Sequence, residues 1–562
     1  MAEPDGGARS WSLSARLPPR PQPVAGASIL ERVLQAARTG DVGQAKRLAR
    51  EALAAGVEHP VVLNLSALDH EEHGRLDAAL ADLCRASALA PADYSILNAL
   101  GLCLVRAGRP EEAKARYLEA LALRADFAPA WFNLGAALEQ LGETARAADA
   151  YAKSAEFEPR NAQAWANLAW LAARRGDRTA AQAHAQRALD LRPGCPAAVL
   201  ALAAVELDRP AQAEARLRGL LARADLSGQE RALGLSQLGD ALDAQGRAPE
   251  AFNAYAAGNG LLRAEAAPRF EAPGRATIAD ALAWLTPWAE GLDPAAWRAN
   301  RDAAAGFGGE AGHVFLLGFP RSGTTLIESA LAAHPGIVSL EERATLDAAV
   351  RDFMGGPAEL SRLGALDGRA LAPYREDYWR RVRELGAHPA GRIFIDKNPF
   401  NTLRLPLIAR LFPRARLVFA VRDPRDVVLS CFRRRFNLNP STYELLDLRR
   451  AAAFYDGAMA FATALRPKLG MAEHTLAYER LVADFEGEAR AVCAFIGAGW
   501  RPELADFAGR ARRGEVASAS AAQIARGLYA DGAGQWRRYQ DQLAPVLGVL
   551  APWVSRLGYA AP

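Results

Sequence analysis

One stretch of the chain, HVFLLGFPRSGTTLIESALAAHP, has the pattern of a strand, a glycine-bounded loop and a helix. In such a unit the loop amides and the helix N-terminus point toward the same place and can hold an anion. Gly318 and Gly323 have the spacing of a nucleotide-binding P-loop. Thr324 stands where that loop has its lysine, Thr325 follows it, and Arg321 lies inside the loop. Because the lysine and its magnesium ion serve triphosphate chemistry, this loop favours an anion that is transferred without them.

A second candidate site lies in RLVFAVRDPRDVVLSCFRRRF, where the apolar strand pattern LVFAV ends at Arg422. Ligands of open α/β sheets bind at the carboxyl ends of the strands. On the helix predicted next, Ser430 and Arg434 are four residues apart and therefore share a face. Two cations and a hydroxyl can converge on one phosphate. The neighbouring Arg433 and Arg435 are predicted to be solvated by water on an arginine-rich helix.

Lys397 follows a third apolar strand pattern in GRIFIDKNPFNTLRL. The chain has five lysines among 68 basic residues, so arginine is its default cation. A lysine offers a compact ammonium that can contact a single bridging oxygen. We therefore expect a functional role for Lys397, and the alternative is an ordinary surface lysine.

Composition limits the classes of function. The 562 residues exceed one ordinary domain, and 51% hydrophobic with 23% charged residues suffices for packed cores. A net charge of +4 does not call for a nucleic-acid partner. The five cysteines form no CxxC, the N-terminus lacks an apolar signal segment, and no apolar run reaches membrane-spanning length. These features predict a cytoplasmic protein without a membrane span, a disulfide framework or a cysteine zinc site.

The first half of the chain is an internal repeat. Five glycines are spaced by 34 residues and each is followed five residues later by alanine; they are Gly40, Gly74, Gly108, Gly142 and Gly176. A glycine that ends one helix and an alanine that lets the next approach predict two helices per unit. This pattern resembles the tetratricopeptide repeat, with six or seven repeats. Such solenoids commonly hold peptides or partner proteins in a concave groove, and the alternative is a scaffold alone.

The predicted organisation is multidomain. Residues 1–26 are expected to be disordered, 27–262 to form an all-α tetratricopeptide-repeat solenoid, 263–312 to be a helical connector, and 313–562 to be an α/β P-loop-like domain with a parallel sheet.

Taken together, the motifs resemble the sulfotransferases that use 3′-phosphoadenosine 5′-phosphosulfate (PAPS). PRSGTT is similar to their 5′-phosphosulfate loop, and Arg422 with Ser430 is similar to their 3′-phosphate motif. The combination with repeats resembles bacterial repeat-containing sulfotransferases, and the catalytic half is nearest the tyrosylprotein sulfotransferases. The resemblance covers about residues 313–540.

The resemblance implies a role for each matched residue. The 5′-phosphosulfate would be held by Arg321, Ser322, Gly323, Thr324 and Thr325. The 3′-phosphate would be held by Arg422, Ser430 and Arg434, and Ser520 with Gln523 matches the family's Ser-x-x-Gln. Lys397 would stabilise charge on the bridging oxygen and Arg321 on the leaving phosphate. Glu342 would be the general base, with Glu341 as the alternative. Gln535 departs from the family pattern, which has arginine at that place.

The resemblance implies PAPS as co-substrate, with no metal, and an acceptor hydroxyl on a peptide or protein, tyrosine first, recruited by the repeat groove. Carbohydrate, lipid and small-molecule acceptors stay open, as does the oligomeric state. Two other functions compete. GRIFID imitates the metal-binding strand of a P-loop kinase and ends at Asp396. The other is a repeat scaffold that retains nucleotide binding without catalysis.

Overall fold

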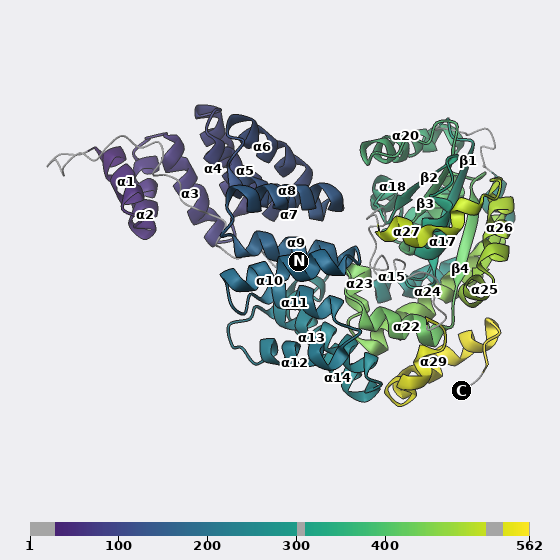
Figure 1. Cartoon of the computed structure of the whole chain (residues 1–562). Coiled ribbons are helices and arrows are strands. Elements are labelled where there is room, and N and C mark those ends of the chain that lie inside the picture. Colours follow the sequence, from purple (N-terminus) through teal and green to yellow (C-terminus); the bar gives the residue numbers. More distant parts are fainter. Residues whose placement is uncertain (1–27, 300–308, 513–531, 561–562) are drawn as a thin grey trace. The chain divides into compact units, whose positions relative to one another are not determined.

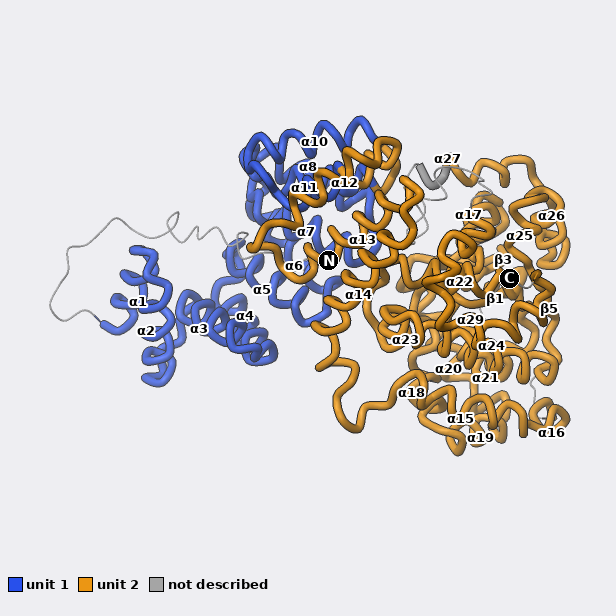
Figure 2. Tube along the Cα trace, turned by 90° about the horizontal axis from the view of Figure 1, so that it is seen from below, with its two compact units in different colours: residues 1–173, 178–202 blue, residues 174–177, 203–562 orange. Residues whose placement is uncertain are grey.

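The computed structural model describes residues 28–299, 309–512 and 532–560. The N-terminal segment 1–26, predicted to be disordered, lies outside the described residues. The chain divides into two compact units, residues 1–173 with 178–202 and residues 174–177 with 203–562 (Figure 2). Within the described ranges, no helix is both long enough and apolar enough to cross a bilayer.

The repeat half consists of helices, which are labelled in Figure 1. They are α1 (Ile29–Arg38), α2 (Val42–Ala54), α3 (Pro60–Glu72), α4 (Leu76–Leu89), α5 (Tyr94–Arg106), α6 (Pro110–Leu123), α7 (Ala128–Gln140), α8 (Thr144–Phe157), α9 (Ala162–Arg174), α10 (Arg178–Leu191), α11 (Pro196–Val205), α12 (Pro210–Leu221), α13 (Gly228–Ala244) and α14 (Ala248–Phe270). The predicted two-helix repeat is confirmed.

The turn between the two helices of a repeat is left-handed, as the glycine period predicts. Gly40, Gly74, Gly108, Gly142 and Gly176 have φ values of 75°, 71°, 75°, 78° and 75°. Residues with a Cβ rarely adopt this conformation, which explains why glycine recurs there. Gly246, between α13 and α14, has φ 75° and marks the same turn in the last helix pair.

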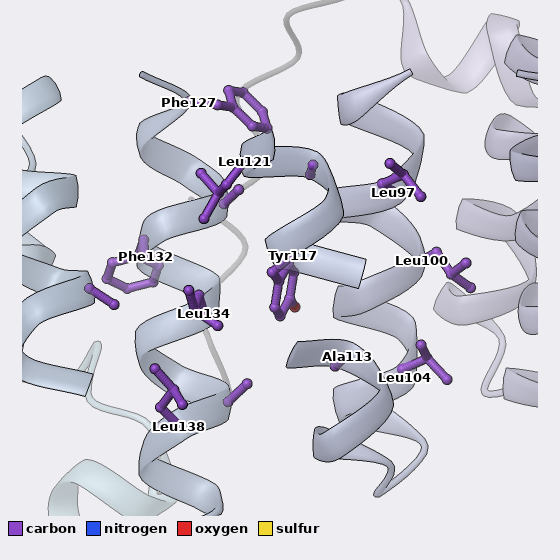
Figure 3. Packing of buried hydrophobic residues seen from close by; sticks show 14 of the residues in the cluster. Leu97, Leu100, Leu104, Ala113, Tyr117, Leu121, Phe127, Phe132, Leu134 and Leu138 are labelled. Carbon is purple, nitrogen blue, oxygen red and sulfur yellow. The ribbon is translucent and has the colours of Figure 1, made fainter. Parts of the chain in front are cut away.

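Inside the first unit, tyrosine rings pack on helical glycines. Tyr117 is fully buried in a hydrophobic cluster that also contains Leu97, Leu100 and Leu104 (Figure 3). A Cβ on Gly101 would lie 2.5 Å from the ring of Tyr117. One period later, a Cβ on Gly135 would lie 2.7 Å from the ring of Tyr151. The same contact returns in the second unit between Gly239 and Tyr255. The repeat is therefore maintained by a close ring-to-backbone contact as well as by its turns.

The second unit contains the predicted parallel sheet. Its strands are β1 (Gly312–Gly318), β2 (Ile337–Glu341), β3 (Ile393–Lys397), β4 (Arg416–Val421) and β5 (Glu473–Ala477). Their order is β2-β3-β1-β4-β5, and every pairing is parallel. The predicted fold class, an all-α repeat followed by an α/β domain, is confirmed.

The helices of this unit come before, between and after the strands along the chain (Figure 1). The α-helices are α15 (Ile278–Gly291), α16 (Pro294–Ala299), α17 (Thr324–Leu331), α18 (Asp347–Phe353), α19 (Pro357–Ala365), α20 (Gly368–Glu384), α21 (Leu405–Leu411), α22 (Pro424–Arg433), α23 (Pro440–Glu444), α24 (Leu448–Leu469), α25 (Tyr478–Ala483), α26 (Phe485–Ile496), α27 (Phe507–Arg512) and α29 (Gln540–Arg556). The 3-10 helices are η3 (Pro399–Arg404), η4 (Pro502–Ala505) and η6 (Gln535–Tyr539).

The two faces of the sheet have different cores because side chains alternate along each strand. One face packs aliphatic residues against α17 and α26, as Val314 and Ile395 do. The other face carries aromatic rings, among them Phe315 and Phe394, which contact rings of α20. Asp396 and Lys397 are consecutive in β3, so they point to opposite faces. Lys397 is placed on the face of α17, the helix that follows the predicted anion loop.

Candidate functional site

The loop between β1 and α17 has the backbone that its glycines predict. Gly318 has φ 144°, and a Cβ there would lie 2.5 Å from the carbonyl oxygen of Ala420 on the neighbouring strand. Gly323 is the N-cap of α17 in a left-handed conformation, with φ 97°. Arg321 also has a positive φ, of 71°, which is uncommon for a residue with a Cβ. The backbone of the loop is therefore tightly constrained.

The loop side chains lie at the carboxyl edge of the sheet. Ser322, Thr324 and Thr325 are buried. Thr402 of η3 supports the strand end, because its hydroxyl donates to the carbonyl oxygen of Gly318 at 2.6 Å and lies 3.0 Å from its amide nitrogen. Sequence reasoning missed this contact, since nothing in NPFNTLRL indicates which strand it will reach.

The structure brings the second predicted motif to this loop. Arg321 donates from Nε to the hydroxyl of Ser430 at 3.0 Å. Arg422 donates from Nη1 to the backbone carbonyl of Arg321 at 2.9 Å and from Nη2 to that of Gly532. The guanidinium of Arg422 also lies 4.4 Å from the ring centre of Tyr478. The two motifs, about 100 residues apart in sequence, therefore form one basic cluster.

Arg422 retains one unused donor. Its Nε is buried and has no hydrogen-bond partner among the described residues. A buried donor without a partner is costly, and buried polar groups are nearly always hydrogen-bonded. A site that receives an oxyanion would satisfy this donor.

The arginines at the end of α22 are less exposed than predicted. Arg433 was expected to be solvated, but its side chain is only 7% exposed, and it pairs with Asp243 of α13. That expectation is wrong, because the repeat helix covering this arginine comes from about 190 residues earlier in the chain. Arg434 is the C-cap residue of α22, and its Nη1 lies 3.5 Å from Oδ2 of Asp240. The predicted convergence of Ser430 and Arg434 on one phosphate stays a prediction. Arg435 is half-buried.

Lys397 is completely buried at the end of β3, so the surface-lysine alternative is wrong. Its Nζ lies 2.8 Å from Oε1 of Glu342, 3.0 Å from Oε1 of Glu341 and 3.4 Å from the hydroxyl of Thr325. Burial alone would lower the pKa of this ammonium. The carboxylates of Glu341 and Glu342 raise it by more, so the net pKa lies above its usual value. Lys397 is therefore protonated beside the loop, where it is paired with both carboxylates.

Both glutamates reach Lys397 from the end of β2. Glu341 is paired with Lys397 in the strand register, and its side chain is 17% exposed. Glu342 follows it with φ 48°, and its side chain is 44% exposed. The left-handed backbone of Glu342 turns its carboxylate back toward the ammonium while leaving it open to solvent. The sequence left Glu341 and Glu342 as alternatives, and the structure brings both of them to the site.

A buried polar network lies behind this segment and was not predicted. Asp396 accepts hydrogen bonds from the hydroxyls of Thr345 at 2.8 Å and Tyr378 at 2.9 Å, and Tyr378 lies 2.9 Å from Nε2 of His313. Burial raises the pKa of Asp396 to about 6, although its two hydroxyl partners lower it. Burial also lowers the pKa of His313 to about 3. Asp396 thus anchors the chain just after Glu342 and faces away from the anion loop.

The C-terminal segment contacts α22. Asp426 accepts hydrogen bonds from the backbone amides of Gly534 at 2.6 Å and Trp536 at 2.8 Å. Arg425 lies over the ring of Trp536, 3.8 Å from its centre. Gln535, the departure from the family pattern, accepts a hydrogen bond from Nη1 of Arg433 at 3.1 Å. The predicted Ser520 and Gln523 lie outside the described residues.

Two parts of the chain match known protein families. Residues 313–502 match a model described as "Sulfotransferase family", and residues 128–161 and 162–195 each match the tetratricopeptide repeat. An uncharacterized protein of Aquifex aeolicus (strain VF5) is 28% identical over 43% of this chain and 33% of its own length. Protein-tyrosine sulfotransferase 1 of Danio rerio is 26% identical over 44% of this chain and 72% of its own length. Protein-tyrosine sulfotransferase 2 of Gallus gallus is 25% identical over 44% of this chain and 69% of its own length.

The chain thus spans one third of the Aquifex protein and about seven tenths of the two sulfotransferases. Among solved structures, PilW, a type IV pilus biogenesis factor, is 18% identical over 38% of this chain and 95% of its own, with a TM-score of 0.32. The loop, the basic cluster and the buried lysine all lie within the residues that match the sulfotransferase model. The chain therefore joins tetratricopeptide repeats to a domain of the sulfotransferase family.

Proposed function

We propose that the protein transfers a sulfuryl group from PAPS to an acceptor hydroxyl, with a peptide or protein as the acceptor and tyrosine as the first candidate. The observation that carries the proposal is the position of Lys397. Its buried ammonium contacts the hydroxyl of Thr325 in the anion loop on one side and the carboxylates of Glu341 and Glu342 on the other. An acid–base group and a cation are thereby joined beside an anion-binding loop.

The residues of the site suit the two anionic ends of PAPS. The loop residues would hold the 5′-phosphosulfate; they are Arg321, Ser322, Gly323, Thr324 and Thr325. The basic cluster would hold the 3′-phosphate through Arg422, Ser430 and Arg434, with Ser520 as a further contact. The unpartnered Nε of Arg422 is the feature that fits an oxyanion best.

The proposed mechanism assigns one role to each group. When bound, PAPS supplies a sulfuryl group activated by its 5′-phosphate leaving group. Glu342 takes the proton of the acceptor hydroxyl, because its carboxylate is open to solvent, whereas that of Glu341 is more enclosed. Lys397 donates to the oxygen on which negative charge collects as the bond to the leaving group breaks. Arg321 and the loop amides hold the leaving phosphate.

Two observations support a peptide or protein acceptor. Tetratricopeptide repeats commonly bind peptides or partner proteins in their groove, and the chain carries such repeats. The curated relatives include enzymes named protein-tyrosine sulfotransferases. We propose the cytoplasm as the compartment because all five cysteines are free thiols.

A P-loop kinase is disfavoured by the surroundings of Asp396. A kinase of this type would use the aspartate at the end of this strand to hold magnesium near the loop. Asp396 is instead buried and bonded to Thr345, Tyr378 and Asn401, on the face of the sheet opposite Lys397.

The test is a calorimetric titration of the full chain with 3′-phosphoadenosine 5′-phosphate, with ATP–Mg as the control. We expect binding that depends on the 3′-phosphate, followed by transfer of labelled sulfate from PAPS to tyrosine peptides. A preference for ATP–Mg would overturn the proposal in favour of a kinase. Nucleotide binding without transfer to any acceptor would favour the inactive scaffold.

A further inference from the structure

A buried ion cluster joins the last repeat to the end of α22. Asp243, in the last turn of α13, accepts hydrogen bonds from Nη2 of Arg433 at 2.6 Å and from the hydroxyl of Tyr539 at 2.7 Å. The side chains of Arg433 and Asp243 are 7% and 12% exposed. The other arm of Arg433 donates to Gln535. A buried arginine with both arms engaged has little freedom to move, so it fixes the end of α22.

Neutral contacts reinforce the same place. Asn259 of α14 donates from Nδ2 to the backbone carbonyl of Phe432 at 2.8 Å, inside the protein. The rings of Phe252 and Phe432 stack with their centres 5.1 Å apart. The helix pair α13–α14 therefore contacts both the backbone and the side chains of the last turn of α22.

The charges are matched in register. Asp240 and Asp243 are three residues apart and lie on one face of α13. They meet two consecutive arginines, because Asp240 lies 3.5 Å from Arg434 and Asp243 pairs with Arg433. Asp240 is itself held by the hydroxyl of Tyr255 at 2.8 Å. One turn of the repeat helix thus determines where both guanidinium groups lie.

We propose that α13–α14 is part of the sulfotransferase rather than a recruiting repeat only, and that Asp243 is a positioning residue for the 3′-phosphate site. Through Arg433, Asp243 fixes the turn of α22 from which Ser430 and Arg434 extend. Asp243 itself touches neither the donor nor the acceptor in this arrangement. The inference rests on the proposed function, because it assigns a support to the site proposed for the 3′-phosphate.

The test compares two nucleotides on the full chain. Dissociation constants for 3′-phosphoadenosine 5′-phosphate and for adenosine 5′-phosphate are measured by calorimetry for the wild type and for Asp243→Asn. We expect the preference for the 3′-phosphorylated nucleotide to fall at least about tenfold, the size of a lost charged hydrogen bond. The affinity for adenosine 5′-phosphate should stay unchanged. Glu250→Gln on α14 is the control, because it makes the same chemical change in an exposed ion pair with Arg247. It should leave the preference intact.

A second variant provides the same test if Asp243→Asn does not fold. Asn259→Ala removes a neutral contact to the same turn of α22 and should also lower the preference. Equal loss of affinity for both nucleotides, or an unchanged preference in both variants, would overturn the positioning role. If the wild type itself shows no preference for the 3′-phosphate, the proposed 3′-phosphate site fails instead, so the two failures are distinguishable.

Discussion

Glu342 and Lys397 are joined twice, once through the backbone and once through their side chains. The amide of Glu342 donates to the carbonyl oxygen of Lys397 at 2.7 Å, and Nζ of Lys397 donates to Oε1 of Glu342 at 2.8 Å. The first bond continues the ladder of β2 and β3, and the second requires the left-handed turn of Glu342. The proposed base and the proposed charge-stabilising lysine are thereby fixed as one unit.

This relationship gives a direct test of the general base. Glu342→Gln keeps the size of the side chain and a hydrogen-bond acceptor for Lys397 but cannot take a proton. We expect sulfate transfer to fall by about 10²–10⁴-fold, the usual contribution of a general base. The affinity for 3′-phosphoadenosine 5′-phosphate should stay nearly unchanged. Single-turnover transfer and calorimetry measure the two quantities.

Glu341→Gln is the matched comparison for that variant, because Glu341 contacts the same ammonium from inside the strand. We expect a smaller loss of transfer than in Glu342→Gln. If Glu342→Gln retains more than about a tenth of the wild-type rate, the roles assigned to the two glutamates are exchanged.

Arg422→Ala tests the 3′-phosphate contact. The substitution removes a side chain whose buried Nε has no hydrogen-bond partner among the described residues. We expect the affinity for 3′-phosphoadenosine 5′-phosphate to fall by roughly ten- to a hundredfold, because a hydrogen bond to a charged group contributes about 1.5–3 kcal/mol. Arg414→Ala removes an exposed arginine shortly before β4 and is the control. Equal affinities in Arg422→Ala and the wild type would contradict the assignment.

The pKa of Asp396 predicts a pH-dependent stability. Because burial raises its pKa from 3.8 to about 6, the folded protein holds this proton more tightly than the unfolded chain. Asp396 therefore costs stability once it ionises, as the pH rises from about 4 to about 6. Asp396→Asn cannot ionise. Over this pH range its free energy of unfolding should rise relative to that of the wild type by about 3 kcal/mol.

Urea unfolding at several pH values, followed by tryptophan fluorescence, measures that difference. His313 is present in both proteins, so its own pKa, lowered to about 3 by burial, cancels when the two are compared. A difference in unfolding free energy that stays constant between pH 4 and pH 7 would show that Asp396 is not perturbed in this way.

Two helical glycines of neighbouring helices should respond to alanine in opposite directions. A Cβ on Gly239 of α13 would lie 2.4 Å from the ring of Tyr255, so Gly239→Ala should destabilise the protein by about 1–3 kcal/mol. Gly219 of α12 is exposed and meets no atom within 4 Å, so Gly219→Ala should stabilise it by about 0.5–1 kcal/mol. Thermal unfolding followed by circular dichroism measures both changes. Equal effects would mean that the ring does not require glycine at position 239.

Much of the fold was predictable from local sequence patterns. The 34-residue period predicted the helix pairs, because each glycine turn and each small residue at a crossing has a local backbone reason. The loop from Gly318 to Gly323 was also predictable, because its glycines are required by a positive φ and by close approach of Ala420. The strand that ends at Lys397 was predicted from its apolar run.

The remaining features depend on contacts between residues far apart in the sequence. Arg433 was predicted to be solvated because its neighbours in sequence are arginines, and only the arrival of α13 buries it against Asp243. The sequence leaves Asp396 open as a metal ligand of a kinase, but the alternation of β3 places it on the face opposite Lys397, beside Tyr378. Neither contact leaves a mark in the nearby sequence, since each partner comes from a separate element.

The sequence by itself determined which residues can bind an anion and where the repeats turn, because spacing and backbone preference act over a few residues. Only the tertiary structure decided which charges meet. The ammonium of Lys397 is paired with Glu341 and Glu342 because two strands lie in register, and Arg433 is paired with Asp243 because a repeat helix packs on α22. Burial then sets the strength of these charges, and burial depends on the folding of the whole chain.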